Sequence, residues 1–140
     1  MAASHVDVVE RLFGLSNRCA AGDADALAEL IAAYHPDAVI ESLVNKGMPT
    51  GGEESIRSYF LEVAQSYEQW HCTLDYAQDF GERVLALGAL RAVPRGGTEQ
   101  EHALGWIFSF RGEKIGAVHA YGSYGEALRA ATARPSLASS

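Results

Sequence analysis

The spacing of apolar residues predicts three amphipathic helices in the first half of the chain. The first covers residues 4–21 and begins with the N-terminal cap spacing of Ser4 and Asp7. Its apolar stripe recurs at intervals of three and four residues and consists of Val8, Leu12, Leu15 and Cys19. A shorter second helix begins at Asp23, has Tyr34 at the C-terminal end of its core face, and stops at His35-Pro36. The third helix covers about 53–68.

The pattern then changes to a period of two, which predicts β-strands. Residues 71–80 alternate between a wetter and a drier face, and further strands follow at 83–93, 99–110 and 115–121. Turn-forming residues separate these four strands, so the strands form an antiparallel meander. A separate strand is expected over 37–44, and a short helix over 124–131.

This order of elements predicts an α+β fold. Two helices, a strand, a third helix and four antiparallel strands are expected to form a curved, mainly antiparallel sheet packed against three helices. Such a cone-shaped arrangement encloses a pocket where its two layers diverge. We expect a single domain over residues 1–131, followed by a flexible C-terminal tail over 132–140.

Composition and charge narrow the range of partners. The 140 residues are 48% hydrophobic and 21% charged, as in an ordinary globular domain. The net charge of −7 has the wrong sign for a nucleic acid partner. The chain lacks a run of about 18 apolar residues, so no membrane association is expected. Two cysteines, Cys19 and Cys72, are too few for a disulfide framework, which favours a cytoplasmic location.

The histidines and glycines show no spacing typical of a metal or phosphate site. The five histidines include no His-x-His or His-x-x-x-His pair, and neither cysteine has a close metal-ligating partner. No glycine-rich segment leads into Gly-Lys-Ser or Gly-Lys-Thr, so a phosphate loop is not expected. We therefore expect no metal site and no cofactor.

Four segments carry a resemblance to a known family. They are residues 20–27 (AAGDADAL), 34–41 (YHPDAVIE), 52–60 (GEESIRSYF) and 112–121 (GEKIGAVHAY). Together they make the chain similar to the nuclear transport factor 2-like superfamily, within its SnoaL-like and ketosteroid-isomerase-like branch. The resemblance implies a cone fold and a homodimer formed through the outer face of the sheet. It implies no single reaction, because the superfamily includes isomerases, cyclases, dehydratases, epoxide hydrolases and proteins without catalytic activity.

The catalytic groups of the steroid isomerase are not found at the equivalent positions. That enzyme uses an Asp base and an oxyanion hole made of a Tyr and a protonated Asp. Here Leu15 stands at the Tyr position, Ser42 at the base position and Trp106 at the second Asp position. Isomerisation by that mechanism is therefore disfavoured. A bulge in the first strand would make Glu41 the base instead of Ser42.

A two-residue turn at Gly96-Gly97 predicts the leading candidate pair. It would place Arg91 opposite His102, and Leu87 opposite Trp106, on one face of the hairpin. An imidazole beside a guanidinium is expected to be neutral and able to exchange a proton near neutral pH. The other interpretation is a solvated cross-strand pair without a catalytic role.

Further residues complete the predicted site. Tyr34 is a candidate phenol donor, and the catalytic set is thus His102, Arg91, Tyr34, Ser42 and Glu41. The predicted substrate-binding lining consists of Trp106, Tyr59, Phe60, Leu15, Leu90 and Val118. His119 and Tyr121 share the opposite face of the last strand, where the family register favours a dimer contact over a catalytic dyad.

These residues favour a cofactor-free enzyme of small-molecule secondary metabolism. The predicted reaction is proton transfer on an apolar, oxygenated substrate such as a polyketide, as in a cyclase, isomerase or dehydratase. The alternative is a non-catalytic module for ligand binding or dimeric association. An epoxide hydrolase is less favoured, because Asp75 and Asp79 lie on one strand and no comparable Asp occurs in the last two strands.

Overall fold

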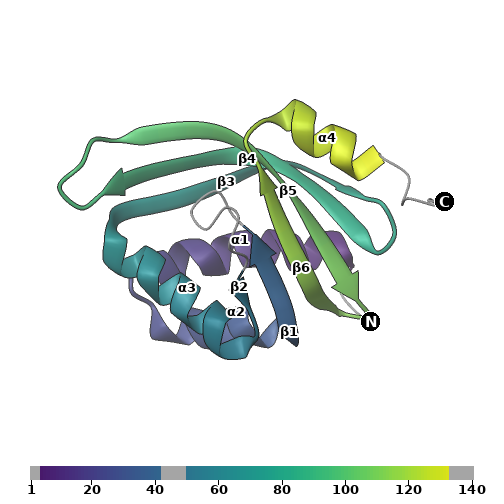
Figure 1. Cartoon of the computed structure of the whole chain (residues 1–140), viewed down its shortest axis with the longest axis horizontal. Coiled ribbons are helices and arrows are strands. Elements are labelled where there is room, and N and C mark those ends of the chain that lie inside the picture. Colours follow the sequence, from purple (N-terminus) through teal and green to yellow (C-terminus); the bar gives the residue numbers. More distant parts are fainter. Residues whose placement is uncertain (1–3, 42–49, 133–140) are drawn as a thin grey trace.

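The computed structural model describes residues 4–41 and 50–132, which form helices on both faces of one curved sheet (Figure 1). The helices are α1 (His5–Ala20), α2 (Ala24–Ala32), α3 (Glu53–Ser66) and α4 (Tyr124–Thr132). The strands are β1 (Tyr34–Glu41), β2 (Thr50–Gly51), β3 (Tyr67–Asp79), β4 (Arg83–Pro94), β5 (Gln100–Arg111) and β6 (Lys114–Tyr121). The predicted α+β class is confirmed. The predicted elements follow in the expected order, with the short strand β2 added, and β3 begins at Tyr67 instead of 71 because α3 ends at Ser66.

The sheet combines the predicted meander with one parallel pairing. Its strand order is β2-β1-β6-β5-β4-β3, and β3 to β6 pair antiparallel as expected. Strand β1 adds to β6 in parallel, with Ile40 opposite Val118 and Glu41 opposite His119. Because β1 lies beside β6, it extends the sheet on the side where α2 and α3 pack (Figure 1).

The second helix is shorter than predicted. Tyr34 opens β1 instead of closing α2, because the backbone N–H of Ile115 donates to the carbonyl of Ala33 at 3.0 Å and starts the pairing with β6 there. His35 precedes a proline and therefore prefers extended backbone. Strand β1 thus begins three residues earlier than the sequence pattern predicts, and residues 42–44 of the predicted strand lie outside the described residues.

The helix starts follow the predicted capping. The N–H of Asp7 donates to the Ser4 hydroxyl at 3.1 Å, and the N–H of Ser4 donates to the Asp7 carboxylate, which completes a capping box. Asp23 accepts from the N–H groups of Asp25 and Ala26. These bonds satisfy backbone donors that a helix start would otherwise leave unpaired.

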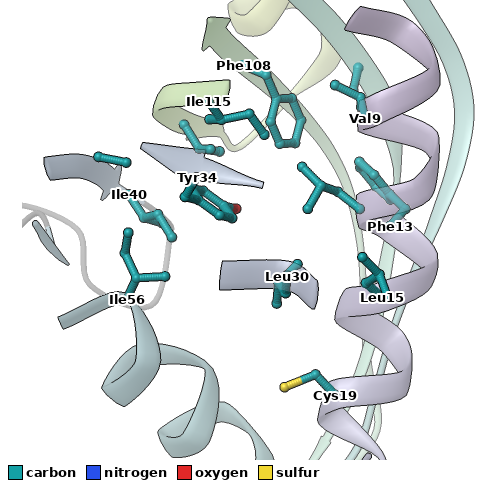
Figure 2. Packing of buried hydrophobic residues seen from close by; sticks show 14 of the residues in the cluster. Val9, Phe13, Leu15, Cys19, Leu30, Tyr34, Ile40, Ile56, Phe108 and Ile115 are labelled. Atoms are coloured by element: carbon teal, nitrogen blue, oxygen red, sulfur yellow. The ribbon is translucent and has the colours of Figure 1, made fainter. Parts of the chain in front are cut away.

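The main core lies between the sheet and the first three helices (Figure 2). Val9, Leu30, Ile56 and Ile115 are fully buried there, contributed by α1, α2, α3 and β6. This packing holds the helices on the concave face of the sheet and so fixes the positions of the residues that face the space between the two layers.

A second, smaller core lies on the outer face of the sheet, under α4. Leu85 of β4 and Ile107 of β5 pack there against Ala127 and Ala131 of α4. The predicted short helix is confirmed, and it covers part of the sheet face opposite α1 (Figure 1). The two guanidinium NH₂ nitrogens of Arg83 donate to the carbonyls of Ala130 and Ala131, which hold the C-terminal end of α4.

One side chain of α1 closes a stretch of the β3 edge of the sheet. The Asn17 amide donates to the Cys72 carbonyl and accepts from the Cys72 N–H, each at 2.8 Å. Farther along β3, the register shifts between Leu74 and Tyr76, and Gly88 of β4 lies opposite Leu74. Over the described residues, no helix is long and apolar enough to cross a membrane.

Candidate functional site

A cavity lies between the concave face of the sheet and helices α1 and α3. It offers about 80 Å³ to the centres of water-sized molecules. A water needs roughly 10–15 Å³ by this measure, so the cavity has room for a small organic molecule. Its described lining is Leu12, Phe13, Ser16, Ala20, Tyr34, Ile40, Glu41, Tyr59, Phe60, Val63, Trp70, Cys72, Trp106, Phe108, Val118 and Ala120.

Aromatic rings make up two walls of this cavity. On one wall, Phe60 of α3 lies 5.0 Å from Tyr59 and 6.3 Å from Tyr34, measured between ring centroids. On the other, Phe13 of α1 meets Trp106 of β5 edge to face at 5.0 Å. Such rings bind flat apolar molecules, and their faces also attract organic cations.

The hydroxyl of Tyr34 is the most distinctive polar group in the cavity. Tyr34 is only 6% exposed and lines the cavity, and its hydroxyl makes no hydrogen bond to another described residue. Figure 2 shows the ring projecting from β1 with its oxygen directed toward α1. Burial, and then the neighbouring Tyr59, raise the pKa of Tyr34 far above its ordinary value of 10. The phenol therefore stays protonated and can donate a hydrogen bond to a bound molecule.

Two further lining residues carry polar side-chain oxygen atoms. Glu41 is the last residue of β1 and supplies the only carboxylate among the described lining residues. Its Oε1 lies 3.2 Å from Nδ1 of His119. Ser16, on α1, adds a half-buried hydroxyl.

Cys72 and Trp70 close the cavity at β3. Burial raises the pKa of the Cys72 thiol to about 12, and a hydrogen bond from Trp70 opposes this only in part. The thiol is therefore neutral at physiological pH and contributes a small apolar surface, since only the thiolate is a strong nucleophile. Among residues 4–41 and 50–132, no three His, Cys, Asp or Glu side chains converge as metal ligands would.

Comparison of the sequence with models of known protein families identifies its family. A model of the SnoaL-like domain matches residues 9–118, which is most of the chain. The chain belongs to the SnoaL-like family. The predicted resemblance to the nuclear transport factor 2-like superfamily is thereby confirmed. None of the curated proteins compared with the chain matches it.

Solved structures share the SnoaL-like fold at low sequence identity. A nuclear transport factor 2-like protein of unknown function from Burkholderia pseudomallei has a TM-score of 0.73 at 17% identity, over 94% of this chain and 99% of that one. A candidate polyketide cyclase from Pseudomonas putida has a TM-score of 0.70 at 16% identity, over 89% and 95%.

A third structure was solved with a small ligand. It is a protein with a ketosteroid-isomerase-like fold from Catenulispora acidiphila, in complex with trimethylamine. Its TM-score is 0.68 at 18% identity, over 96% of this chain and 100% of that one. Likenesses this distant establish the architecture of the SnoaL-like chain and leave its reaction to the site residues.

The predicted Arg91–His102 pair does not form in this SnoaL-like sheet. Arg91 lies opposite Glu101, and His102 lies opposite Leu90, one residue away from the predicted register. The reason is the turn: the N–H of Gly97 donates to the Pro94 carbonyl at 2.9 Å, so the two-residue turn on Gly96-Gly97 is not formed.

A shift of one residue moves a side chain to the other face of a strand. The same shift separates Leu87 from Trp106: Ala86 lies opposite Trp106, and Leu87 lies opposite Gly105. His102 is exposed, and Arg91 pairs with the Glu99 carboxylate at 3.0 Å in solvent. Neither residue lines the described cavity. The register supports the other interpretation, in which Arg91 and His102 are solvated residues of the hairpin without a catalytic role.

The other predicted residues divide into three groups. Tyr34, Glu41, Trp106, Tyr59, Phe60 and Val118 all line the cavity. Leu15 and Leu90 do not, because Leu15 packs in the main core and Leu90 in a separate cluster with Ala92 and Leu104. Ser42 lies outside the described residues. The prediction missed Ser16, which lines the cavity. It directly follows Leu15, the residue of the same helix that was expected to line the cavity.

Proposed function

We propose that this protein binds a small, largely apolar molecule with an oxygen acceptor and transfers a proton on it, as a cyclase, isomerase or dehydratase does. The observation that carries the proposal is Tyr34, a residue only 6% exposed that lines an aromatic cavity and whose hydroxyl makes no hydrogen bond to another described residue. That hydroxyl is therefore open to a hydrogen bond with a molecule bound in the cavity. A carbonyl oxygen is a suitable acceptor.

Tyr34 would act as the electrophile. When a proton leaves the carbon next to a carbonyl, negative charge gathers on the carbonyl oxygen. The O–H of Tyr34 would donate to that oxygen, and its raised pKa keeps the donor protonated throughout. One such donor in a water-poor site contributes about 10²–10³ to kcat.

Glu41 would act as the general base. It is the only acidic residue among the described lining residues, which are otherwise mainly apolar, and its carboxylate lies at the rim beside His119. A positioned carboxylate contributes about 10²–10⁴ by taking up the proton. Candidate polyketide cyclases from Pseudomonas putida and Sinorhizobium meliloti share the fold, which supports polyketide-like ketones as the substrate class.

The test is exchange of carbon-bound hydrogen for deuterium. The protein would be incubated in D₂O with a panel of cyclic ketones and aromatic β-diketones, and deuterium next to the carbonyl would be followed by NMR. We expect Tyr34→Phe and Glu41→Gln each to lower kcat about 100-fold. Tyr76→Phe and Glu99→Gln are matched controls, because both residues are exposed and lie outside the cavity lining. A wild-type rate equal to the protein-free rate for every ketone would refute the proposal.

A second candidate function is non-catalytic binding of a compact organic cation. Aromatic faces together with one carboxylate attract tertiary and quaternary ammonium groups, and the relative from Catenulispora acidiphila was solved with trimethylamine. Calorimetry with tetramethylammonium and with neutral tert-butanol separates the two candidates. Binding of the cation alone, abolished by Glu41→Gln, would favour this second function.

The predicted homodimer is part of the proposal. Helix α4 covers the outer face over β4 and β5, so an interface on that face would use β1 and β6, where Val39 is 39% exposed. Sedimentation equilibrium at high protein concentration tests it, and a monomer would contradict it.

We also propose a cytoplasmic location, which both free cysteines, Cys19 and Cys72, support.

A further inference from the structure

The contact between Glu41 and His119 crosses from one strand to the next at the rim of the cavity. Strand β1 lies beside β6 (Figure 1), and their parallel register places Glu41 beside His119. The neighbours Ile40 and Val118 both line the cavity. Successive residues of a strand point to opposite faces. His119 and Glu41 therefore both leave the face of Ile40 and Val118, and they meet where β1 ends, at the rim of the cavity that Glu41 lines.

The imidazole of His119 is itself held in place. Its ring lies 4.4 Å from the ring of Tyr121, tilted by 30°, on the same face of β6. Burial raises the pKa of Tyr121, the nearby charge of Glu41 raises it further, and Arg83 opposes both. Glu41, His119 and Tyr121 thus form one connected group that begins at the cavity lining and ends on the outer face of the sheet.

We propose that His119 is a positioning residue that fixes the Glu41 carboxylate at the cavity rim. This inference rests on the proposed function, in which Glu41 is the base. A glutamate side chain has three rotatable bonds, and few of its rotamers would bring an oxygen to a bound substrate. The contact of Nδ1 of His119 with Oε1, at 3.2 Å, favours one of them and holds the carboxylate at the end of β1.

Two substitutions separate positioning from other roles. His119→Phe keeps a ring against Tyr121 but has no donor for Glu41. His119→Asn keeps an N–H at about the place of Nδ1 but cannot accept and pass on a proton near neutral pH. His71→Phe is the matched control, because His71 is an exposed histidine of β3 outside the cavity lining.

Deuterium exchange on the active ketone gives the decisive comparison. We expect His119→Phe to lower kcat about tenfold with KM changed less than about twofold, as for other partners that orient a reacting group. His119→Asn should recover kcat to within about threefold of the wild type, and His71→Phe should leave it unchanged. An unchanged His119→Phe variant overturns the inference. So does an equal loss in both His119 variants, which would indicate that the imidazole carries the proton itself.

The two proposals fail in different ways. A wild-type protein without exchange on any ketone overturns the proposed function and this inference together, whereas an active wild type with an equally active His119→Phe variant overturns only the inference. Nitrogen-15 spectra of the imidazoles provide a readout besides activity. Glu41→Gln should shift the Nδ1 signal of His119 and leave that of His71 in place, and an unshifted signal counts against the pair.

Discussion

Gly105 of β5 and Ala127 of α4 approach so closely that a methyl group on Gly105 would lie 2.2 Å from the Ala127 Cβ. Both are fixed by backbone elements, so the clash cannot be relieved by rotating a flexible side chain. Gly105→Ala should therefore displace α4 and lower the free energy of unfolding by about 1–3 kcal/mol, the usual range for overpacking. Chemical denaturation followed by circular dichroism would measure the change.

Gly14→Ala is the matched control for that substitution. Gly14 is exposed on α1, and a Cβ there meets nothing within 4 Å. Alanine has the higher helix propensity, so this variant should be about 0.5–1 kcal/mol more stable than the wild type. If Gly105→Ala were as stable as Gly14→Ala, the close packing of α4 on β5 would be wrong.

Substitution of Asn17 should loosen α1 from β3. Asn17→Ala removes both hydrogen bonds to the Cys72 backbone, and we expect a loss of about 1–2 kcal/mol in the free energy of unfolding. Asn17→Asp should be at least as harmful, because a carboxylate cannot donate to the Cys72 carbonyl and would repel it. Hydrogen exchange at the Cys72 amide should accelerate in both variants, and protection equal to that of the wild type would contradict the double contact.

Alkaline pH should destabilise the fold through Cys72. Burial raises the pKa of its thiol from 9 to about 12, so the folded protein keeps a proton that the unfolded chain releases. This contribution is complete below pH 9 and is lost as the pH rises from 9 to 12. Between pH 9 and 12 the denaturation midpoint should therefore fall less steeply with pH in Cys72→Ala than in the wild type. Parallel curves for Cys72→Ala and the wild type would show that the thiol does not contribute.

Tyr34→Phe should separate stability from ligand binding. The Tyr34 hydroxyl makes no hydrogen bond to another described residue, so removing it breaks none of these bonds and the variant should be as stable as the wild type. The same change should weaken binding of a ketone ligand about tenfold, since one hydrogen bond is lost. Thermal unfolding and calorimetry test the two halves, and a large loss of stability would mean that the hydroxyl has a partner within the protein.

The elements of the fold could be predicted because each depends on local chemistry. The helical stripe of α1 and the cap at Asp23 depend on residues close together in the sequence. The cap is confirmed, and so is the stripe except at Val8, which is half-buried while Val9 is buried. The parallel pairing of β1 with β6 joins residues nearly 80 positions apart and leaves no local periodicity, so it was not predicted. Tyr34 was assigned to α2 because its spacing fits a helix, whereas the distant β6 draws it into a strand.

The candidate site was predicted in part for the same reason. Aromatic residues on the core faces, such as Trp106 and Phe60, necessarily face the space between helices and sheet, and they line the cavity. The Arg91–His102 pair depended on the geometry of a single turn, where an error of one residue exchanges the two faces of a hairpin. The Glu41–His119 contact depended on the unpredicted parallel pairing, so the sequence pattern could not place these two residues together.

The Asn17 contact also limits how the sheet can grow. Strand β3 is the last in the strand order, and an unpaired edge strand readily adds a strand from another molecule. At Cys72 the amide of Asn17 occupies both the donor and the acceptor positions that such a strand would need. A single side chain of α1 thus protects this part of the edge from edge-to-edge aggregation.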